Sequence, residues 1–442
     1  MLAAERSGLL LRGPRREPHR TRSLAELANT SAKEGIVTTN VVVLGAGFGG
    51  LELTSRLSEA LGTEVSVTLI DRSEAFVFGF NKFDVLFGWK TLDEARAYYR
   101  DIVKPGVVFR QETITSIDPE ARRVVTDGAA YDADILVVAL GADYDFAATP
   151  GFVEGGHEFY SLGGVQRLRE LLPSITRGRV LISVLGEPFK CPPAPCEAAM
   201  LLDQWFTQRG LRENIEISVT SPWSRPIPPS PDGSKAILDR FAERGIAFVT
   251  ETLVVSIDPA AKVAHLRDGG TMPYDLFLGI PVHRVPAVVQ ASPLAENGWI
   301  PVDKGTLATR FPGVFAVGDV TSVGTPKAGV FSENAAAIVA DEIIAQVRSA
   351  ARAPATSNSA MSAWLASTPI SSAGRARLPH FAGRPPRSRA RRMRSPWPGG
   401  SDGLATASRG TYPRLRCAGR PRKPAGTARR PEGALPRGFT FA

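Results

Sequence analysis

Cysteine and histidine are scarce in this chain of 442 residues, which holds 3 cysteines and 5 histidines. So few cysteines cannot form a disulfide framework, and the fold must therefore be held by an apolar core. His157, His265 and His283 are scattered, without the spacing that metal ligands share. We therefore predict no metal site.

Long apolar runs are also missing. No run approaches the ~18–20 residues that span a bilayer, so no transmembrane helix is predicted. The apolar part of the N-terminal stretch SGLLLRG is too short for a signal peptide, and several arginines follow it. We expect a cytoplasmic protein, for which peripheral contact with a membrane stays open.

Acidic residues are rare near one end of the chain. The net charge is +9, but the segment after Pro354 carries 17 Lys/Arg against 2 Asp/Glu, a net charge of +15, which leaves −6 for the rest. The excess positive charge therefore belongs to this segment. It does not indicate a nucleic-acid partner for the folded body.

The two ends of the chain lack periodic apolar residues. Residues 1–36 are rich in Arg, and residues 353–442 are rich in Arg, Pro and Gly but poor in Leu, Ile, Val and Phe. Such segments cannot bury enough apolar surface to offset their chain entropy, so both are expected to be disordered. The C-terminal segment is either a genuine basic tail or a GC-rich coding region translated out of frame.

Between these ends, strand and amphipathic helix patterns alternate, which is typical of an α/β fold. Two stretches, ITSIDPEARRVVTDGAAYDADIL and VVSIDPAAKVAHLRDGGTMPYDLFL, resemble each other and predict hairpins inserted after a nucleotide-binding-like unit. We therefore predict an α/β protein with two Rossmann-like units, each with an inserted β-meander. The predicted strands are 41–44, 65–70, 135–139, 180–185, 215–220 and 314–316, and the predicted helices are 49–60, 164–172, 197–208 and 332–348.

The stretch VVVLGAGFGGLELTSRL combines a strand, a glycine-rich turn and a helix. Gly45 permits the tight turn, Gly47 lets the backbone approach a pyrophosphate, and Gly50 allows the helix to pack closely on the strand. Together with Phe48, these residues are predicted to bind the phosphates of a dinucleotide at a helix N-terminus. Asp71 ends the next strand, about 20 residues on, where a carboxylate can bond the ribose.

Two later motifs suggest that the dinucleotide is FAD. TRFPGVFAVGDV, with Gly318 and Asp319, resembles the second FAD motif of flavoproteins with two dinucleotide-binding domains. ILVVALGADYD, with Gly141, resembles another conserved stretch of the same proteins. On this resemblance, residues 37–150 and 286–352 form the FAD-binding unit, and residues 151–285 form a second Rossmann-like unit.

The second unit lacks the glycine motif that would bind NAD(P)H. Its first strand leads into GEPFKCPPAPCEAA, where only Gly186 remains and prolines stand where N–H groups would hold a pyrophosphate. The next strand ends at Ser221, which offers no carboxylate to a ribose. The sequence therefore argues against NAD(P)H binding.

The segment FKCPPAPCEAA resembles the C-P-P-x-P-Y-E segment of sulfide:quinone oxidoreductases and of flavocytochrome c sulfide dehydrogenases. GDVTSVGTPKAGVFSENAAAIVA resembles their stretch after the second FAD motif. The resemblance implies an FAD-dependent enzyme that oxidises sulfide or a small thiol and passes electrons to quinone or a protein acceptor. It implies Cys191 as the attacking thiol, Glu197 as proton acceptor and Lys327 beside the flavin. We expect Lys190 and the helix start to lower the pKa of Cys191.

The sequence departs from this family at two points. Cys196 stands where Tyr is usual, and the family's partner cysteine in the C-terminal half is missing, because Cys417 lies in the tail. Cys196 is either a packed core residue or a substitute resolving thiol. Two other functions stay open: an NAD(P)H-dependent flavin reductase or type II NADH dehydrogenase, and an inactive flavin-binding protein that has lost its C-terminal region.

Two further features have no fixed role. Phe76, Phe78, Phe80 and Phe83 could form a wall of the flavin site, although core packing is the commoner role of such a cluster. His283, in GIPVHRVPAVV, is expected in a loop that could line a quinone or sulfide channel. The oligomeric state is left open.

Overall fold

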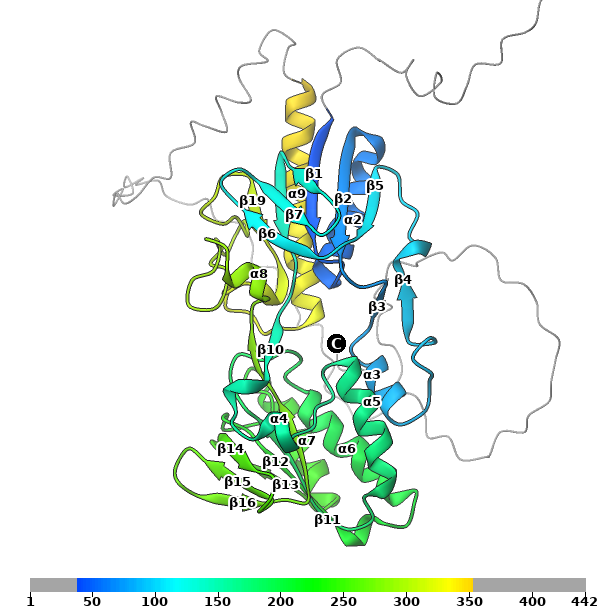
Figure 1. Cartoon of the computed structure of the whole chain (residues 1–442), viewed down its shortest axis with the longest axis vertical. Coiled ribbons are helices and arrows are strands. Elements are labelled where there is room, and N and C mark those ends of the chain that lie inside the picture. The colour runs from blue at the N-terminus through cyan, green and yellow to red at the C-terminus, as the bar shows by residue number, and fades with distance from the viewer. Residues whose placement is uncertain (1–37, 353–442) are drawn as a thin grey trace, which may run out of the picture. The chain divides into compact units, whose positions relative to one another are not determined.

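The computed structural model describes residues 38–352. The predictions for residues 1–36, for residues 353–442 and for Cys417 lie outside this part of the chain. Figure 1 shows the arrangement of the helices and strands.

Helices and strands alternate along the described chain. The helices are α2 (Phe48–Leu61), α3 (Asn81–Leu86), α4 (Phe152–Gly155), α5 (Leu162–Leu171), α6 (Ala194–Thr207), α7 (Pro231–Glu243), α8 (Ala287–Gln290) and α9 (Gly329–Arg352). The strands are β1 (Thr39–Leu44), β2 (Val65–Asp71), β3 (Ala75–Val77), β4 (Arg96–Tyr98), β5 (Val107–Gln111), β6 (Ile114–Asp118), β7 (Arg123–Thr126), β8 (Ala130–Asp132), β9 (Ile135–Val138), β10 (Asp143–Asp145), β11 (Gly178–Val184), β12 (Ile215–Thr220), β13 (Ile246–Val249), β14 (Val254–Asp258), β15 (Val263–Leu266), β16 (Thr271–Pro273), β17 (Leu276–Ile280), β18 (Val282–Arg284) and β19 (Val314–Ala316).

The first large sheet is parallel and has the strand order β19-β9-β1-β2-β5. Strand β1 is buried on both faces: Val41 and Val43 contribute to one apolar cluster, and Val42 and Leu44 to another. This division follows from the alternation of side chains along a strand. Helices α2 and α9 pack against each other and cover the first of these clusters (Figure 1).

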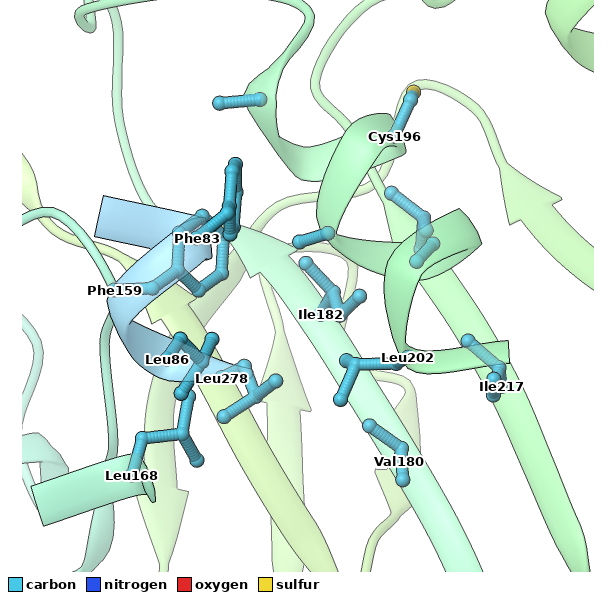
Figure 2. Packing of buried hydrophobic residues seen from close by; sticks show 14 of the residues in the cluster. Phe83, Leu86, Phe159, Leu168, Val180, Ile182, Cys196, Leu202, Ile217 and Leu278 are labelled. Atoms are coloured by element: carbon cyan, nitrogen blue, oxygen red, sulfur yellow. The ribbon is translucent and has the colours of Figure 1, made fainter. Parts of the chain in front are cut away.

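The second large sheet is also parallel, with the order β13-β12-β11-β17. Figure 2 shows Ile182 of β11, Ile217 of β12 and Leu202 of α6 packed within one apolar cluster. The cluster also receives Phe83 and Leu86 of α3 and Leu168 of α5 (Figure 2). Short strands β10 and β18 pair antiparallel where the chain enters and leaves this region.

The predicted fold class is confirmed, because both parallel sheets and both inserted meanders are present. The meanders β6-β7-β8 and β14-β15-β16 are three-stranded and antiparallel. Helices α3, α4, α7 and α8 were not predicted, and the predicted start of α6 at Glu197 was late, since α6 begins at Ala194. The boundaries 37–150, 151–285 and 286–352 stay a prediction.

Candidate functional site

The residues predicted to bind a dinucleotide follow the carboxyl ends of neighbouring strands. Leu44 of β1 is in register with Val138 of β9 and Ile70 of β2, and Val138 is in register with Ala316 of β19. Gly45, Gly141, Gly318 and Asp71 therefore come together at one edge of the parallel sheet. Ligands of open α/β sheets bind at this edge.

The glycine turn leaves room and hydrogen-bond donors for a ligand. Gly45 has a φ of +96, and a Cβ there would lie 2.5 Å from the carbonyl oxygen of Ala139. A Cβ on Gly50 would lie 1.9 Å from the carbonyl oxygen of Gly45, whereas one on Gly47 would meet nothing within 4 Å. Within residues 38–352, the N–H groups of Phe48, Gly49 and Gly50 donate to no acceptor. These open donors at the start of α2 fit an anionic phosphate.

Asp71 stabilises this turn through hydrogen bonds. Its Oδ2 accepts a hydrogen bond from the N–H of Ala46 at 2.8 Å, and its Oδ1 accepts one from the N–H of Ser73 at 2.8 Å. The buried Tyr99 donates its hydroxyl to the carbonyl oxygen of Ala46 at 2.7 Å. The predicted contact of Asp71 with a ribose is untested and stays a prediction.

The second predicted FAD motif borders a small cleft. Gly318 has a φ of +78, and a Cβ there would meet Oγ of Ser332 at 2.7 Å. Asp319 is half-buried, and this burial raises the pKa of its carboxyl group. The cleft is lined by Gly318, Asp319, Thr321, Val323, Thr325, Pro326, Lys327, Phe331, Ser332 and Ala335.

Lys327 is buried beside Asp319. Its Nζ donates to the carbonyl oxygens of Asp319 at 2.6 Å and Thr321 at 3.1 Å, and it lies 3.5 Å from the ring centroid of Trp299. Burial lowers its pKa to about 8, although the neighbouring Asp319 opposes this shift. Lys327 thus retains most of its charge at neutral pH.

Cys191 lies against the segment that contains Lys327. The N–H of Cys191 donates to the carbonyl oxygen of Lys327 at 2.7 Å, and Lys190 and Lys327 form a parallel bridge. Tyr160 holds the preceding peptide by donating its hydroxyl to the carbonyl oxygen of Lys190 at 2.9 Å. Cys191 has a φ of +52, which is unusual for a residue with a Cβ. Such backbone strain clusters at functional sites.

The expected lowering of the Cys191 pKa is wrong. Burial, followed by the nearby Glu197, raises the pKa of the Cys191 thiol to about 11, against the weaker opposing effects of the Ala194 N–H and Lys82. Lys190 does not help because its Nζ donates to the carbonyl oxygen of Ala142 at 2.7 Å and lies 4.3 Å from the ring centroid of Tyr144. The amino group is thus bound to another part of the chain.

Cys196 occupies the first turn of α6. It is 2% exposed and belongs to the apolar cluster of the second sheet (Figure 2). Burial raises the pKa of its thiol to about 12. Both Cys191 and Cys196 are free thiols. The packing of Cys196 favours a core role, and its role as a resolving thiol stays a prediction.

Glu197 follows Cys196 in the same turn and is half-buried. Burial, together with the charge of Asp84, raises the pKa of its carboxyl group to about 7. A carboxyl group with this pKa exchanges a proton near neutral pH, which suits a general acid or base. The charge of Glu197 acts on the Cys191 thiol and raises its pKa, so these two predicted residues lie within electrostatic reach of each other.

The second unit offers no phosphate site at the matching position. The N–H of Ala194 donates to the carbonyl oxygen of Cys191, the N–H groups of Cys196 and Glu197 both donate to that of Pro193, and Pro195 has no N–H. Next to this helix start, Phe189 and Trp223 stack at 4.9 Å between ring centroids. The first turn of α6 therefore lacks the open donors of α2.

A buried polar cluster that no sequence motif predicted lies next to Cys191. Lys82 of α3 donates its Nζ to the carbonyl oxygen of Tyr160, and Tyr144 donates its hydroxyl to the same oxygen at 3.2 Å. Tyr144 and Tyr160 both lie edge-on to His283, which belongs to strand β18 and not to a loop. No motif marks these residues, because they come from distant parts of the chain.

The four phenylalanines divide between two environments. Phe83 is 6% exposed and belongs to the core of the second sheet. Phe76, Phe78 and Phe80 are half-buried and follow one another, with Phe48 packed edge-on against Phe76 at 5.0 Å and Phe78 at 5.4 Å. Only Phe83 is thus a core residue of the kind expected.

Comparison with known proteins agrees with this arrangement. The family model of pyridine nucleotide-disulphide oxidoreductases matches residues 39–182 and 197–353. The mitochondrial sulfide:quinone oxidoreductase of Dictyostelium discoideum is 26% identical over 342 residues, which cover 74% of this chain and 75% of that protein. The alternative NAD(P)H-ubiquinone oxidoreductase C1 of Arabidopsis thaliana is 26% identical over 248 residues, which cover 50% of this chain and 46% of that protein.

Among solved structures, the sulfide:quinone oxidoreductase of Aquifex aeolicus matches with a TM-score of 0.62 and 24% identity, over 70% of this chain and 77% of that one. This likeness supports the fold. The chain belongs to the pyridine nucleotide-disulphide oxidoreductase family, and the predicted resemblance to sulfide:quinone oxidoreductases is confirmed. The family model skips residues 183–196, which contain the proline-rich cysteine segment.

Membership of this family and the similar proteins imply a flavin cofactor. The open N–H donors at the start of α2 and the space over Gly47 fit the phosphates of such a group. Within residues 38–352, no helix has the length and apolar character needed to cross a membrane.

Proposed function

We propose that the protein is an FAD-dependent oxidoreductase that oxidises sulfide, or another small thiol, at Cys191 and passes the electrons to quinone or a protein acceptor. The single observation that carries this proposal is the hydrogen bond from the N–H of Cys191 to the carbonyl oxygen of Lys327. It brings a thiol from the second sheet to the segment that follows the Gly318-Asp319 motif.

The residues around Cys191 would have distinct tasks. FAD would be held by the turn Gly45–Gly50, by Asp71 and by Asp319, and it would accept the two electrons that leave sulfur. Cys191 would form an S–S bond to the substrate sulfur, which gives a persulfide from sulfide or a mixed disulfide from a thiol, as both S–H protons leave and FAD takes the two electrons. Glu197 would take the proton released from the thiol or from sulfide, because burial sets its pKa to about 7. Lys327 would place a positive charge beside Asp319.

An NAD(P)H-dependent flavin reductase is the second candidate, because relatives named NAD(P)H-ubiquinone oxidoreductase also match the chain. The start of α6 weighs against it, since its N–H groups are already used or replaced by proline. The stacked pair of Phe189 and Trp223 adds bulk next to the same helix start. We therefore rank this function below sulfide oxidation.

An inactive flavin-binding protein is the third candidate. It rests on the missing partner cysteine of the family, because Cys196 is packed in the core and Cys417 lies outside the described residues. The visible spectrum of the purified protein tests it first. Absence of a flavin spectrum, with FAD failing to bind on addition, would contradict the proposal.

Anaerobic titration distinguishes the two enzyme functions. We expect sulfide to bleach the flavin and NADH to bleach it slowly or not at all. The variant Cys191→Ser should lose bleaching by sulfide while its flavin content stays unchanged. Rapid bleaching by NADH, or unchanged bleaching by sulfide in Cys191→Ser, would refute the assignment.

A further inference from the structure

His283 lies in the middle of strand β18, directly opposite Tyr144 of β10. It is 5% exposed. The rings of Tyr144 and Tyr160 stand edge-on to its imidazole, with centroids 5.1 Å and 5.6 Å away. The side chain is therefore enclosed by aromatic neighbours at the place where the chain passes between the two large sheets.

The hydrogen bonds of His283 are incomplete. Its Nδ1 lies 2.7 Å from the carbonyl oxygen of Pro281. A carbonyl oxygen can only accept, so Nδ1 carries the proton and Nε2 presents a lone pair. Nε2 is buried and has no hydrogen-bond partner among residues 38–352. A buried acceptor left without a donor costs about 1–3 kcal/mol, which favours occupation of this position by a donor.

The surroundings keep this imidazole neutral. Burial, followed by the charge of Lys190, lowers the pKa of His283 to about 3, and Lys327 and Lys82 act in the same direction. The other titratable groups that face it are the phenols of Tyr144 and Tyr160. Burial raises the pKa of Tyr144 to about 12, so neither phenol supplies a negative charge at neutral pH. His283 is thus an acceptor and not a donor.

Tyr160 contacts both His283 and the residue before Cys191. The ring of Tyr160 touches His283, and its hydroxyl donates to the carbonyl oxygen of Lys190. Cys191 follows Lys190 in the chain. Tyr144 donates to the carbonyl oxygen of Tyr160, and Lys82 and Lys190 bring positive charge to the same cluster.

We propose that His283 is a positioning residue of the Cys191 site, whose Nε2 accepts a hydrogen bond from the S–H group of the sulfide or thiol substrate. The proposal rests on the proposed function, which it deepens by naming how the substrate is held. The charge of Lys82, which acts on the Cys191 thiol, favours the hydrosulfide anion, since this anion combines one S–H donor with a negative charge. No bond is made or broken at His283.

Separate measurement of the half-saturating sulfide concentration and of the limiting rate tests this role. In His283→Leu, the sulfide concentration that gives half-maximal flavin bleaching should rise about five- to tenfold, as expected for one neutral hydrogen bond, with an unchanged limiting rate. His283→Gln, whose amide oxygen can accept, should recover part of the affinity. His265→Leu is the matched control, because His265 is an exposed residue of β15, and this variant should behave like the parent protein. A fall in the limiting rate alone would overturn the proposal.

A second measurement does not depend on turnover. The ¹⁵N signal of Nε2 in flavin-loaded Cys191→Ser, assigned with His283→Gln, should show an unbonded acceptor and move upfield when sodium sulfide is added. A signal that is already shifted without sulfide would mean that a water molecule or the flavin is the donor, and the proposal would be wrong. An unshifted signal that ignores sulfide would also overturn it.

The two proposals fail in distinguishable ways. If sulfide bleaches the flavin but the Nε2 signal and the half-saturating concentration do not respond to these variants, only the role of His283 is wrong. If sulfide never bleaches the flavin, the proposed function is wrong. The Nε2 signal then still decides whether an S–H ligand binds.

Discussion

The backbone of Cys191 is held in the left-handed region, with a φ of +52. This conformation costs a residue with a Cβ about 1–3 kcal/mol, so the surrounding structure must hold the backbone in it. The hydrogen bond from its N–H to Lys327 and the bond from Tyr160 to the Lys190 carbonyl act on both sides of this residue. The position of the thiol is thus set by residues far away in the sequence.

The reactivity of Cys191 should depend on Lys82 more than on Lys190. Lys82 lowers the pKa of the thiol electrostatically, whereas the amino group of Lys190 is directed to the carbonyl oxygen of Ala142. We expect Lys82→Met to slow alkylation of Cys191 by iodoacetamide at pH 8, and Lys190→Met to slow it less. Mass spectrometry of the peptide that contains Cys191 measures both rates. Equal slowing by the two variants would contradict this assignment.

The raised pKa of Glu197 leads us to expect that the stability of the fold depends on pH. Burial, with Asp84, raises its pKa from 4.5 to about 7. Protonation of this carboxyl group therefore stabilises the folded state relative to its stability at high pH, and this stabilisation is complete below pH 4.5. This contribution is lost as the pH rises through 7. Glu197→Gln should therefore raise the free energy of unfolding at pH 8.5 by roughly 2–3 kcal/mol and leave it almost unchanged at pH 4.

Urea unfolding at the two pH values measures this difference. Glu243→Gln is the control, because Glu243 is exposed in a pair with Arg240. A gain for Glu197→Gln that is equal at both pH values would show that the raised pKa is not its cause. A protonated Glu197 cannot accept a proton, so bleaching of the parent protein by sulfide should fall below pH 7. Bleaching of Glu197→Gln should be slow and should lack this pH dependence.

Sequence patterns predicted the site residues unevenly. The glycine turn, Asp71, Cys191 and Glu197 lie in short motifs, so their neighbours along the chain already show how they are placed. Lys82, Tyr160 and His283 form one cluster next to Cys191 only because α3, the residues before α5 and β18 meet there. The predicted lowering of the Cys191 pKa was wrong for the same reason, since the direction of the Lys190 side chain depends on tertiary contacts.

At the scale of elements, α2 and α6 begin at matching places in the two parallel sheets but differ in their first turns. The start of α2 has open N–H groups, whereas the donors of α6 are used by Cys191 and Pro193 or replaced by Pro195. An α-helix offers an anion only the N–H groups that are not already bonded. The two Rossmann-like units can thus share a fold and differ in ligand.

Substitutions of two glycines test the ligand at α2. A Cβ on Gly47 or on Gly79 meets nothing within 4 Å, and neither residue has a positive φ. Gly47→Ala should therefore fold normally but lower flavin content, because the methyl group would lie in the path of the phosphates. Gly79→Ala should change neither property.

Absorbance of the flavin and the thermal midpoint of the flavin-free protein measure the two effects. Full flavin content in Gly47→Ala would show that the phosphates do not bind next to Gly47. A lower midpoint of the flavin-free protein would instead show that Gly47 has a purely structural role.

Most elements of the two sheets were predicted because their periods are clear. Strand β1 contains an apolar run, and β12 alternates apolar and polar residues, so both have patterns typical of strands. Helix α7 was missed because its apolar positions, Ile237 and Phe241, are few and follow a proline-rich stretch. The pairing of β10 with β18 joins residues far apart in the sequence, and no local pattern indicates it.

At the scale of the whole molecule, all groups that we place around Cys191 lie within residues 38–352, whereas the excess positive charge lies after Pro354. The half-reaction with sulfide should therefore be separable from residues 353–442. A chain that ends at Arg352 should bind flavin and be bleached by sulfide at the rate of the full chain.

Anaerobic stopped-flow measurement of both chains tests this prediction, with Cys417→Ser in the full chain as the matched control. The full chain, the shortened chain and Cys417→Ser should be bleached at the same rate, because Cys417 would not take part in the first attack on sulfur. Loss of bleaching in both the shortened chain and Cys417→Ser would make Cys417 the missing partner cysteine. Loss in the shortened chain alone would show that residues 353–442 support the site without that thiol. Either outcome would contradict a reaction centre confined to residues 38–352.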